Sequence, residues 1–231
     1  MARIYGERWQ EPDGVQQDFQ NPPEGWDRSS AGIPPNALQD MVWLSDPDTN
    51  RRLMVFMAHQ EGAGVHDLAG ADLIYDTVSH SSIVFVQYKR LSKASTVRPS
   101  ELDREQLAVL LNLCSGQGCC HMDGTNYFEH TAIRVGDCPV YYKLLDHEPQ
   151  IDSKSRRMIG KYIQACLLNQ SLDQRPTVRK EIVARSIPHA TFYGLLGQTQ
   201  IGSRASIYAD LRQRVLDFMR DKAVYAAETQ L

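Results

Sequence analysis

Three polar residues that could do chemistry together lie near the middle of the chain: Asp72, Gln87 and Lys89. Asp72 opens the short apolar segment 72–75, and the other two close a longer one, 83–89. A carboxylate and an amide oxygen are ligands for a hard cation such as Mg²⁺, which keeps several waters for a substrate phosphate. A lysine beside them would orient an attacking water or stabilise developing negative charge. Such a set is typical of phosphodiester hydrolysis.

Two strands joined by a turn are needed to position these side chains. Both segments are rich in β-branched and aromatic residues, and polar turn formers separate them over 76–82, so we predict an antiparallel hairpin. Side chains alternate along a strand, which places Gln87 and Lys89 on one face and Tyr88 on the other. In a hairpin of this length we expect the Asp72 carboxylate to lie beside Gln87 and Lys89. The backbone carbonyl of Tyr88 would be a further ligand for the cation.

The segments Gly70–Ile74 and Phe85–Arg90 resemble the core of the PD-(D/E)XK nucleases, in particular the Mrr-type restriction endonucleases, whose second motif reads Q-x-K. The resemblance implies that Asp72 is the metal-binding acid, that Gln87 replaces the usual second acid, and that Lys89 is the catalytic lysine. It also implies endonucleolytic cleavage of DNA with Mg²⁺ or Mn²⁺, in defence against foreign DNA. The fold it implies is restriction-endonuclease-like: a mixed central sheet flanked by helices.

Gln87 departs from the wider superfamily, because a neutral amide compensates less of the cation's charge than a carboxylate. Glu61 and Asp67 are auxiliary ligands in this interpretation, because their glycine-containing loop can bend towards Asp72. The resemblance covers roughly residues 52–113, less than a third of the chain. The alternative is an ordinary hairpin whose aspartate caps a turn and whose glutamine and lysine face solvent.

Basic residues follow the second strand and would hold DNA phosphates beside the cation. They are Lys89, Arg90, Lys93 and Arg98. The same residues would equally fit a solvated loop. The formal charge of −3 gives no global basic field, so contact with nucleic acid needs a local patch or a partner protein.

Four of the five cysteines fall in one glycine-rich region, residues 114–138. The potential ligands of a tetrahedral structural Zn²⁺ site are Cys114, Cys119, His121 and Cys138. Their spacing is unlike the usual close pairs, and buried or incidental thiols are the alternative. Cys166 lies on an apolar helical stripe and is expected in the core. The seven histidines form no compact metal motif, so each is interpreted as structural.

The chain divides into three parts by composition. Residues 1–40 are rich in Pro, Gly, Gln and acidic residues and predict an irregular arm anchored by its tryptophans. The resemblance implies that residues 41–150 form a nuclease-like core, with the cysteine-rich insertion at 114–138. Residues 151–231 are expected to be mainly helical and packed on that core, with a glycine-rich break at 194–202.

The pattern of apolar residues places further elements around the hairpin. Apolar runs at 52–58 and 140–145 predict strands. The spacing after Ser100, an N-cap residue, predicts an amphipathic helix that packs on the sheet. Helices are also predicted around 158–167 and 207–219. The predicted fold class is therefore α/β, with a mixed central sheet flanked by helices.

The sequence also bears on partners and location. No stretch approaches the roughly 18 to 20 apolar residues of a membrane span, and the N-terminus has no signal-peptide core, so we expect a cytoplasmic protein without a membrane partner. A homo-oligomer or a subunit of a defence complex is expected, since cutting both DNA strands generally needs two active sites. The alternative is a degenerate nuclease fold that serves as a non-catalytic subunit or adaptor. In that case Asp72, Gln87 and Lys89 should be splayed apart or plugged.

Overall fold

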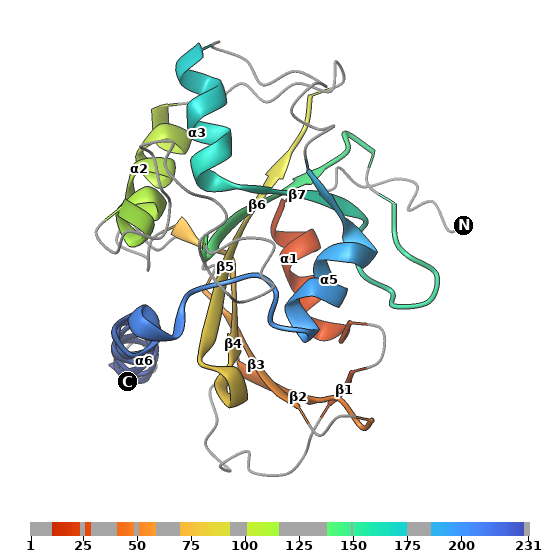
Figure 1. Cartoon of the computed structure of the whole chain (residues 1–231), viewed down its shortest axis with the longest axis vertical. Helices are drawn as coiled ribbons and strands as arrows, with labels where there is room; N and C mark the ends of the chain where they lie inside the picture. Colours follow the sequence, from red (N-terminus) through yellow and green to blue (C-terminus); the bar gives the residue numbers. More distant parts are fainter. Residues whose placement is uncertain are drawn as a thin grey trace.

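One sheet with helices on both faces organises the chain (Figure 1). The computed structural model describes residues 11–23, 26–28, 41–48, 51–58, 70–92, 101–115, 138–148, 150–174 and 186–228. Within them the prediction of an α/β fold with a mixed central sheet is confirmed.

The sheet has eight strands that follow one another in chain order. They are β1 (Asp27–Arg28), β2 (Met41–Ser45), β3 (Arg52–Met57), β4 (Leu73–Thr77), β5 (Ser82–Arg90), β6 (Val140–Leu145), β7 (Gly160–Gln164) and β8 (Ile187–Pro188). All neighbouring strands are antiparallel except β5 and β6, which are parallel. A parallel pair needs a crossover, and the helix α2 (Glu101–Ser115) lies within this connection.

Two hydrophobic cores lie on opposite faces of the sheet. On the first, which we call the α2 face, the sheet packs against α2, α3 (Ala165–Gln174) and α6 (Ala205–Glu228). On the second, the α5 face, it packs against α1 (Glu11–Gln20) and α5 (His189–Gly197). Because β5 is covered on both sides, its residues are buried from Ser82 to Tyr88, which explains its continuous apolar run.

The hairpin predicted from the sequence is present as β4 and β5. Its register pairs Leu73 with Val86 and Thr77 with Ser82, and a 3-10 helix, η2 (Val78–His80), makes the turn. The strands predicted at 52–58 and 140–145, the helix after Ser100 and the C-terminal helix are also confirmed, as β3, β6, α2 and α6. These elements each carry a periodic apolar pattern of their own.

The prediction of an irregular N-terminal arm is wrong for residues 11–20, which form α1. Val15 and Phe19 of this helix are 1% and 8% exposed and belong to the core of the α5 face. Trp26 is buried there too, so one of the two expected tryptophan anchors is confirmed. An isolated helix of ten residues is marginal in water, and packing on the sheet supplies the stability that its composition does not indicate.

The helix predicted around 158–167 is wrong in its first half, where residues 160–164 form β7 and α3 begins only at Ala165. These residues form a strand and not a helix because β7 pairs with β6, where Tyr162 lies opposite Lys143. The part after residue 150 is mainly helical, as predicted, with α3, α5 and α6, and β7 and β8 in addition extend the sheet. The glycine-rich break is also shorter than predicted, because Gly194 and Gly197 lie within α5.

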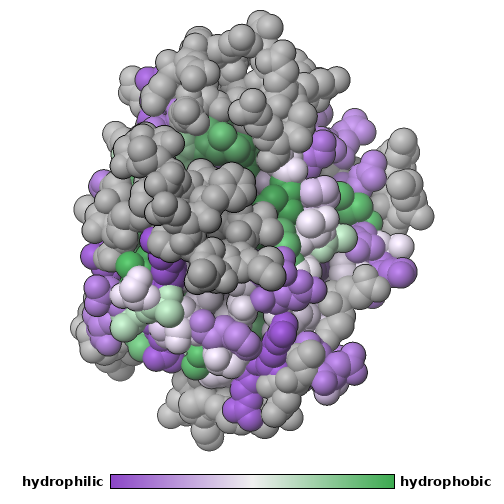
Figure 2. Space-filling model, in the orientation of Figure 1, coloured by the Kyte–Doolittle hydropathy of each residue, from purple (hydrophilic) through white to green (hydrophobic). Residues whose placement is uncertain are grey.

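The exposed surface of the described residues is mixed in polarity. The large hydrophobic side chains that reach solvent are scattered: Val78, Val109, Ile159 and Leu216. On the face shown in Figure 2, hydrophobic residues lie in small groups between hydrophilic ones. Among the helices of the described segments, none has the length and apolar character to cross a bilayer.

Candidate functional site

Asp72 and Gln87 lie side by side where β4 begins and β5 approaches its end. The Gln87 amide donates from Nε2 to Asp72 Oδ2 at 2.8 Å, and the backbone N–H of Tyr88 donates to the same oxygen at 2.6 Å. Both side chains are buried, with 6% and 5% exposed. The predicted meeting of these two residues is confirmed, and the hairpin register produces it.

Lys89 is half-buried at the end of β5. Strand alternation puts it on the α2 face with Gln87, as predicted. Arg90 lies on the opposite face, and its guanidinium donates to His147 Nδ1 at 3.3 Å. Lys89 and Arg90 therefore extend from opposite faces at the end of β5, and the predicted basic cluster stays a prediction. The other two basic residues of the predicted cluster, Lys93 and Arg98, lie outside the described residues.

The Gln87 side chain also offers an acceptor at this site. Its Oε1 is buried and has no hydrogen-bond partner among the described residues. A buried acceptor left without a donor is unfavourable. Turning the amide over would direct Oε1 towards the Asp72 carboxylate, an approach of two oxygens that is favourable only with a cation between them.

The oxygens within reach of such a cation fit a small hard ion. They come from the Asp72 carboxylate, the Gln87 amide and the Tyr88 carbonyl, which already accepts a 3.2 Å bond from Gln87. The described residues contain no cluster of three or more His, Cys, Asp or Glu side chains able to hold a metal. A site with few protein ligands and several waters is the kind that Mg²⁺ occupies. Glu61 and Asp67, the predicted auxiliary ligands, lie outside the described residues.

The zinc site stays a prediction. Cys119, His121 and the side chain of Cys114 are outside the part of the chain that the structure describes. Cys138 is 3% exposed, and its thiol donates to the carbonyl of Val140 at 3.3 Å. Cys166 is half-buried and packs against the core of the α2 face, in line with its expected place.

A buried ionic cluster lies behind the Asp72–Gln87 pair, on the α5 face. The Tyr88 hydroxyl donates to Asp18 Oδ2 at 2.6 Å, and Lys143 forms an ion pair with the same oxygen. The backbone N–H of Met158 donates to Asp18 Oδ1 at 2.7 Å. Arg157 is 3.8 Å from Asp18 as well. Tyr88 thus joins α1 to the candidate site, through its side chain on one face and its backbone at Asp72.

Burial and charge act against each other in this cluster. Burial by itself raises the pKa of Asp18, but Lys143 and Arg157 outweigh it and hold that pKa below its ordinary value. Burial lowers the pKa of Lys143 to about 8, and Asp18 opposes the change. Both groups of the pair are therefore predominantly charged at neutral pH.

Sequence reasoning missed Asp18, Lys143 and Arg157. A lysine in the middle of the apolar run 140–145 is the one signal that could have been used, because burial of lysine requires a partner. Nothing in the composition of the N-terminal part singles out Asp18 as that partner. Asp18 and Lys143, which form this ion pair, are 125 positions apart in the sequence.

Gly70 sets the path of the chain into β4, two residues before Asp72. Its φ is +67°, and a Cβ there would lie 3.2 Å from the Cβ and Cγ of Gln106 on α2. We expect Gly70→Ala to lower the free energy of unfolding by about 1–2 kcal/mol, because alanine is strained at positive φ. Urea denaturation measures this loss. Gly70→Asn has the same Cβ but tolerates this backbone better, so an equal loss in both variants would contradict the backbone explanation.

Comparison of the chain with protein-family models, with curated proteins and with solved structures finds no match. The geometry of the site itself therefore indicates what chemistry the chain can perform. That geometry consists of one carboxylate, one half-buried lysine and one amide whose oxygen has no partner among the described residues, at the end of two strands.

Proposed function

We propose that this chain is a metal-dependent endonuclease that hydrolyses phosphodiester bonds of DNA, with Asp72, Gln87 and Lys89 as its site. The observation that carries the proposal is the contact of the Asp72 carboxylate with the Gln87 amide, whose buried Oε1 has no partner among the described residues. Lys89 follows two positions later on the same strand face. The resemblance to the PD-(D/E)XK nucleases, including their restriction-endonuclease-like fold, belongs to this proposal.

The place of the site within the sheet supports the proposal. In α/β sheets, ligands bind outside the carboxyl ends of parallel strands. Gln87 and Lys89 approach that end of β5, beside its parallel neighbour β6, where they pair with Tyr142 and Leu144. The start of β4 brings Asp72 to the same edge, because β4 and β5 are antiparallel.

Each residue of the site has a distinct part in the proposed reaction. The Asp72 carboxylate and the Gln87 amide oxygen would hold Mg²⁺ or Mn²⁺, and the Tyr88 carbonyl would complete the protein ligands. When bound, such an ion polarises the phosphoryl group and makes a water more acidic. Lys89 orients that water and stabilises the negative charge that develops on the phosphate oxygens. The water oxygen forms a bond to phosphorus while the bond to the leaving sugar oxygen breaks. The water gives one proton to solvent, and the leaving oxygen takes up one proton from solvent.

A non-catalytic adaptor is the second candidate function, and one observation favours it. Asp72 Oδ2 already accepts hydrogen bonds from the Gln87 amide and the Tyr88 backbone, so the carboxylate oxygen is plugged, which is one of the two arrangements expected of an adaptor. In the nuclease reading, cation binding replaces the first of these bonds. In the adaptor reading, it remains and only stabilises the hairpin.

The biological setting of the proposal rests on the resemblance alone. It comprises DNA as substrate, a cytoplasmic role in defence against foreign DNA, and a homo-oligomer or larger complex that brings two sites to the two strands. Fold-level analogy of this kind suggests a role but does not derive one from the site.

Cleavage of plasmid DNA with Mg²⁺ or Mn²⁺ tests the proposal. We expect the native chain to nick or linearise the plasmid only when the ion is present. Asp72→Asn removes the charge that holds the ion but keeps an oxygen for the Tyr88 N–H. Lys89→Gln removes the ammonium group. Each variant is expected to cleave at least about 100-fold more slowly, the typical loss on removing one group that stabilises transition-state charge.

Matched controls separate the site from general effects of charge. Asp210→Asn and Lys161→Gln make the same replacements at exposed positions on α6 and β7 and should cleave as the native chain does. Metal-dependent cleavage that survives both site variants would place the active site elsewhere. A native chain that folds but cuts no DNA, alone or with its natural partners, would favour the adaptor.

A further inference from the structure

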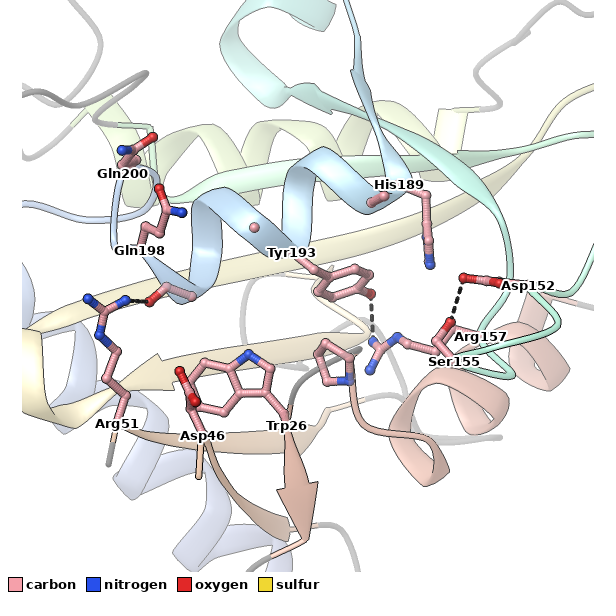
Figure 3. A pocket seen from close by; sticks show the side chains of 14 residues that line it. Trp26, Asp46, Arg51, Asp152, Ser155, Arg157, His189, Tyr193, Gln198 and Gln200 are labelled. Atoms are coloured by element: carbon pink, nitrogen blue, oxygen red, sulfur yellow. Dashed lines mark hydrogen bonds between the residues drawn. The ribbon is translucent and has the colours of Figure 1, made fainter. Parts of the chain in front are cut away.

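A cavity lies on the α5 face, across the sheet from the Asp72–Gln87 pair. We call it the α5 pocket. It has a volume of about 810 Å³, within the range of small-molecule sites. Figure 3 shows Arg51 and Asp46 at one end, Arg157, His189 and Asp152 at the other, and Trp26 between them. The nuclease proposal does not use this cavity.

Small residues of α5 make room for the pocket. Ala190, Gly194 and Gly197 line it from one side of the helix. Apart from the adjacent residues and the backbone of α5 itself, no atom of the described part of the chain lies within 4 Å of the place where a Cβ of Gly194 would be. A Cβ at Gly197 would be 3.4 Å from the indole of Trp26, so the two glycines border an open trough with an aromatic wall. A flat organic group fits such a trough.

Two buried polar atoms at the Arg157 end lack partners in the described structure. They are Nε of Arg157, a donor, and Nδ1 of His189. The side chains are 1% and 8% exposed, and both line the pocket. The other guanidinium nitrogens of Arg157 are held by the carbonyl of Asn21 and the hydroxyls of Tyr75 and Tyr193. This guanidinium is thus fixed in place with one donor left over, and buried donors of this kind ordinarily have an acceptor.

The charges around this end favour a negatively charged acceptor. Lys143 and Arg157 are two buried cations that share one buried carboxylate, Asp18. Burial and the positive charge of Lys143 lower the pKa of His189 to about 3, so this imidazole is neutral. His189 is also the first residue of α5, whose N-terminal end carries a partial positive charge.

Asp152 also faces this end of the α5 pocket. Its two oxygens accept hydrogen bonds from the Lys154 backbone and the Ser155 hydroxyl, each at 3.0 Å. Hydrogen bonds from its own loop therefore occupy this carboxylate, and it is half-exposed at the rim. Water screens its charge more than it screens the buried cations.

We propose that the α5 pocket binds a small molecule that carries an oxyanion, either a carboxylate or a phosphate. The oxyanion lies at the end formed by Arg157, His189 and the first turn of α5. The rest of the ligand is flat and lies over Gly194 beside Trp26. The oxyanion accepts a hydrogen bond from Nε of Arg157, and the flat group fills the trough.

Titration calorimetry with four probes tests this proposal: phenyl phosphate, benzoate, the neutral benzamide and inorganic phosphate. We expect saturable binding of phenyl phosphate or benzoate to the native chain, at least about tenfold tighter than binding of benzamide. The tighter of the two anions identifies the ligand as a phosphate or a carboxylate. Inorganic phosphate should bind more weakly than phenyl phosphate, because it lacks the ring.

Gly194→Leu places an apolar side chain in the trough, and its Cβ has ample room there. We expect it to weaken binding of the preferred probe at least about tenfold while the melting temperature without ligand stays at or above that of the native chain. Thr191→Leu adds the same side chain at an exposed position of α5 that does not line the pocket and should bind normally.

Three outcomes would overturn the proposal. Failure of both ring-containing anions to bind at millimolar concentration would mean that water alone fills the pocket. Equal binding of benzamide and the anions would exclude the oxyanion. Unchanged binding to Gly194→Leu would put the ligand somewhere else. All of these readouts are independent of DNA cleavage, so failure of the nuclease proposal would leave them unaffected.

Discussion

Replacement of Asp18 by asparagine is expected to lower the free energy of unfolding by about 3–5 kcal/mol, because it leaves buried cations without their carboxylate. Lys143 is 0% exposed and pairs with Asp18, and Arg157 is 3.8 Å from it. The variant keeps the shape of the side chain, so packing of α1 is not the cause of the loss. Urea denaturation measures the change. Asp27→Asn, at an exposed position of β1, is the matched control and should change stability little.

A double-variant cycle tests whether Asp18 acts through Lys143. Lys143→Met, added to Asp18→Asn, removes one of the two cations that Asp18→Asn leaves without a carboxylate. The combined loss of unfolding free energy should therefore be smaller than the sum of the single losses by about 0.5–3 kcal/mol. Additive losses would show that the two side chains act independently, against the ion pair that the structure shows.

The effect of Asp18 should also depend on pH. Its pKa in the folded chain is below the ordinary 3.8, so the unfolded chain binds the proton more readily. The stability that the carboxylate contributes is therefore present above about pH 4 and is lost as the pH falls through the folded pKa. The difference in stability between the native chain and Asp18→Asn should shrink below pH 4. A difference that grows on acidification would contradict the ion pair.

Gly202→Ala should destabilise the chain by roughly 3 kcal/mol, from backbone strain and a steric clash together. Gly202 has a φ of +110°, and a Cβ there would lie 2.5 Å from Ser82 Oγ and 3.0 Å from the carbonyl of Ile83. The next residue, Ser203, holds the start of β5 by accepting a 3.0 Å hydrogen bond from the Ile83 N–H. We expect a fall in melting temperature of about 6–12 °C.

Gly194→Ala is the matched control for this loss. It makes the same substitution in α5, where, apart from the adjacent residues and the helix backbone, no described atom lies within 4 Å of the added carbon. Alanine is a better helix former than glycine, so this variant should be as stable as the native chain or more so. Similar losses in Gly202→Ala and Gly194→Ala would refute the explanation that the positive φ and the close contacts of Gly202 cause its loss of stability. They would point instead to a general need for glycine at both positions.

The sequence by itself determined the hairpin and the contact at its end. The apolar runs of β4 and β5, the turn formers between them and strand alternation are local properties, and they place Asp72, Gln87 and Lys89 without knowledge of the rest of the chain. The same holds for β3, β6, α2 and α6, because an element with its own apolar periodicity can be recognised from a short window.

Only the tertiary structure decided which weakly patterned segments join the fold. Residues 11–20 have few apolar side chains, and they become α1 because the sheet buries Val15, Phe19 and Asp18. Residues 160–164 carry a pattern that also fits a helix, and the free edge of β6 makes them β7. In both cases a distant partner supplies the free energy that local propensity lacks.

The two features on the α5 face likewise depend on distant pairing. Asp18, Lys143 and Arg157 give no shared signal in the sequence, since their meeting depends on the order of β5, β6 and β7 in the sheet. The α5 pocket is formed by segments as far apart as Trp26 and Gln200. A sequence determines side-chain chemistry and local spacing, whereas burial, which shifts pKa values and leaves donors unpaired, exists only once the whole sheet has assembled.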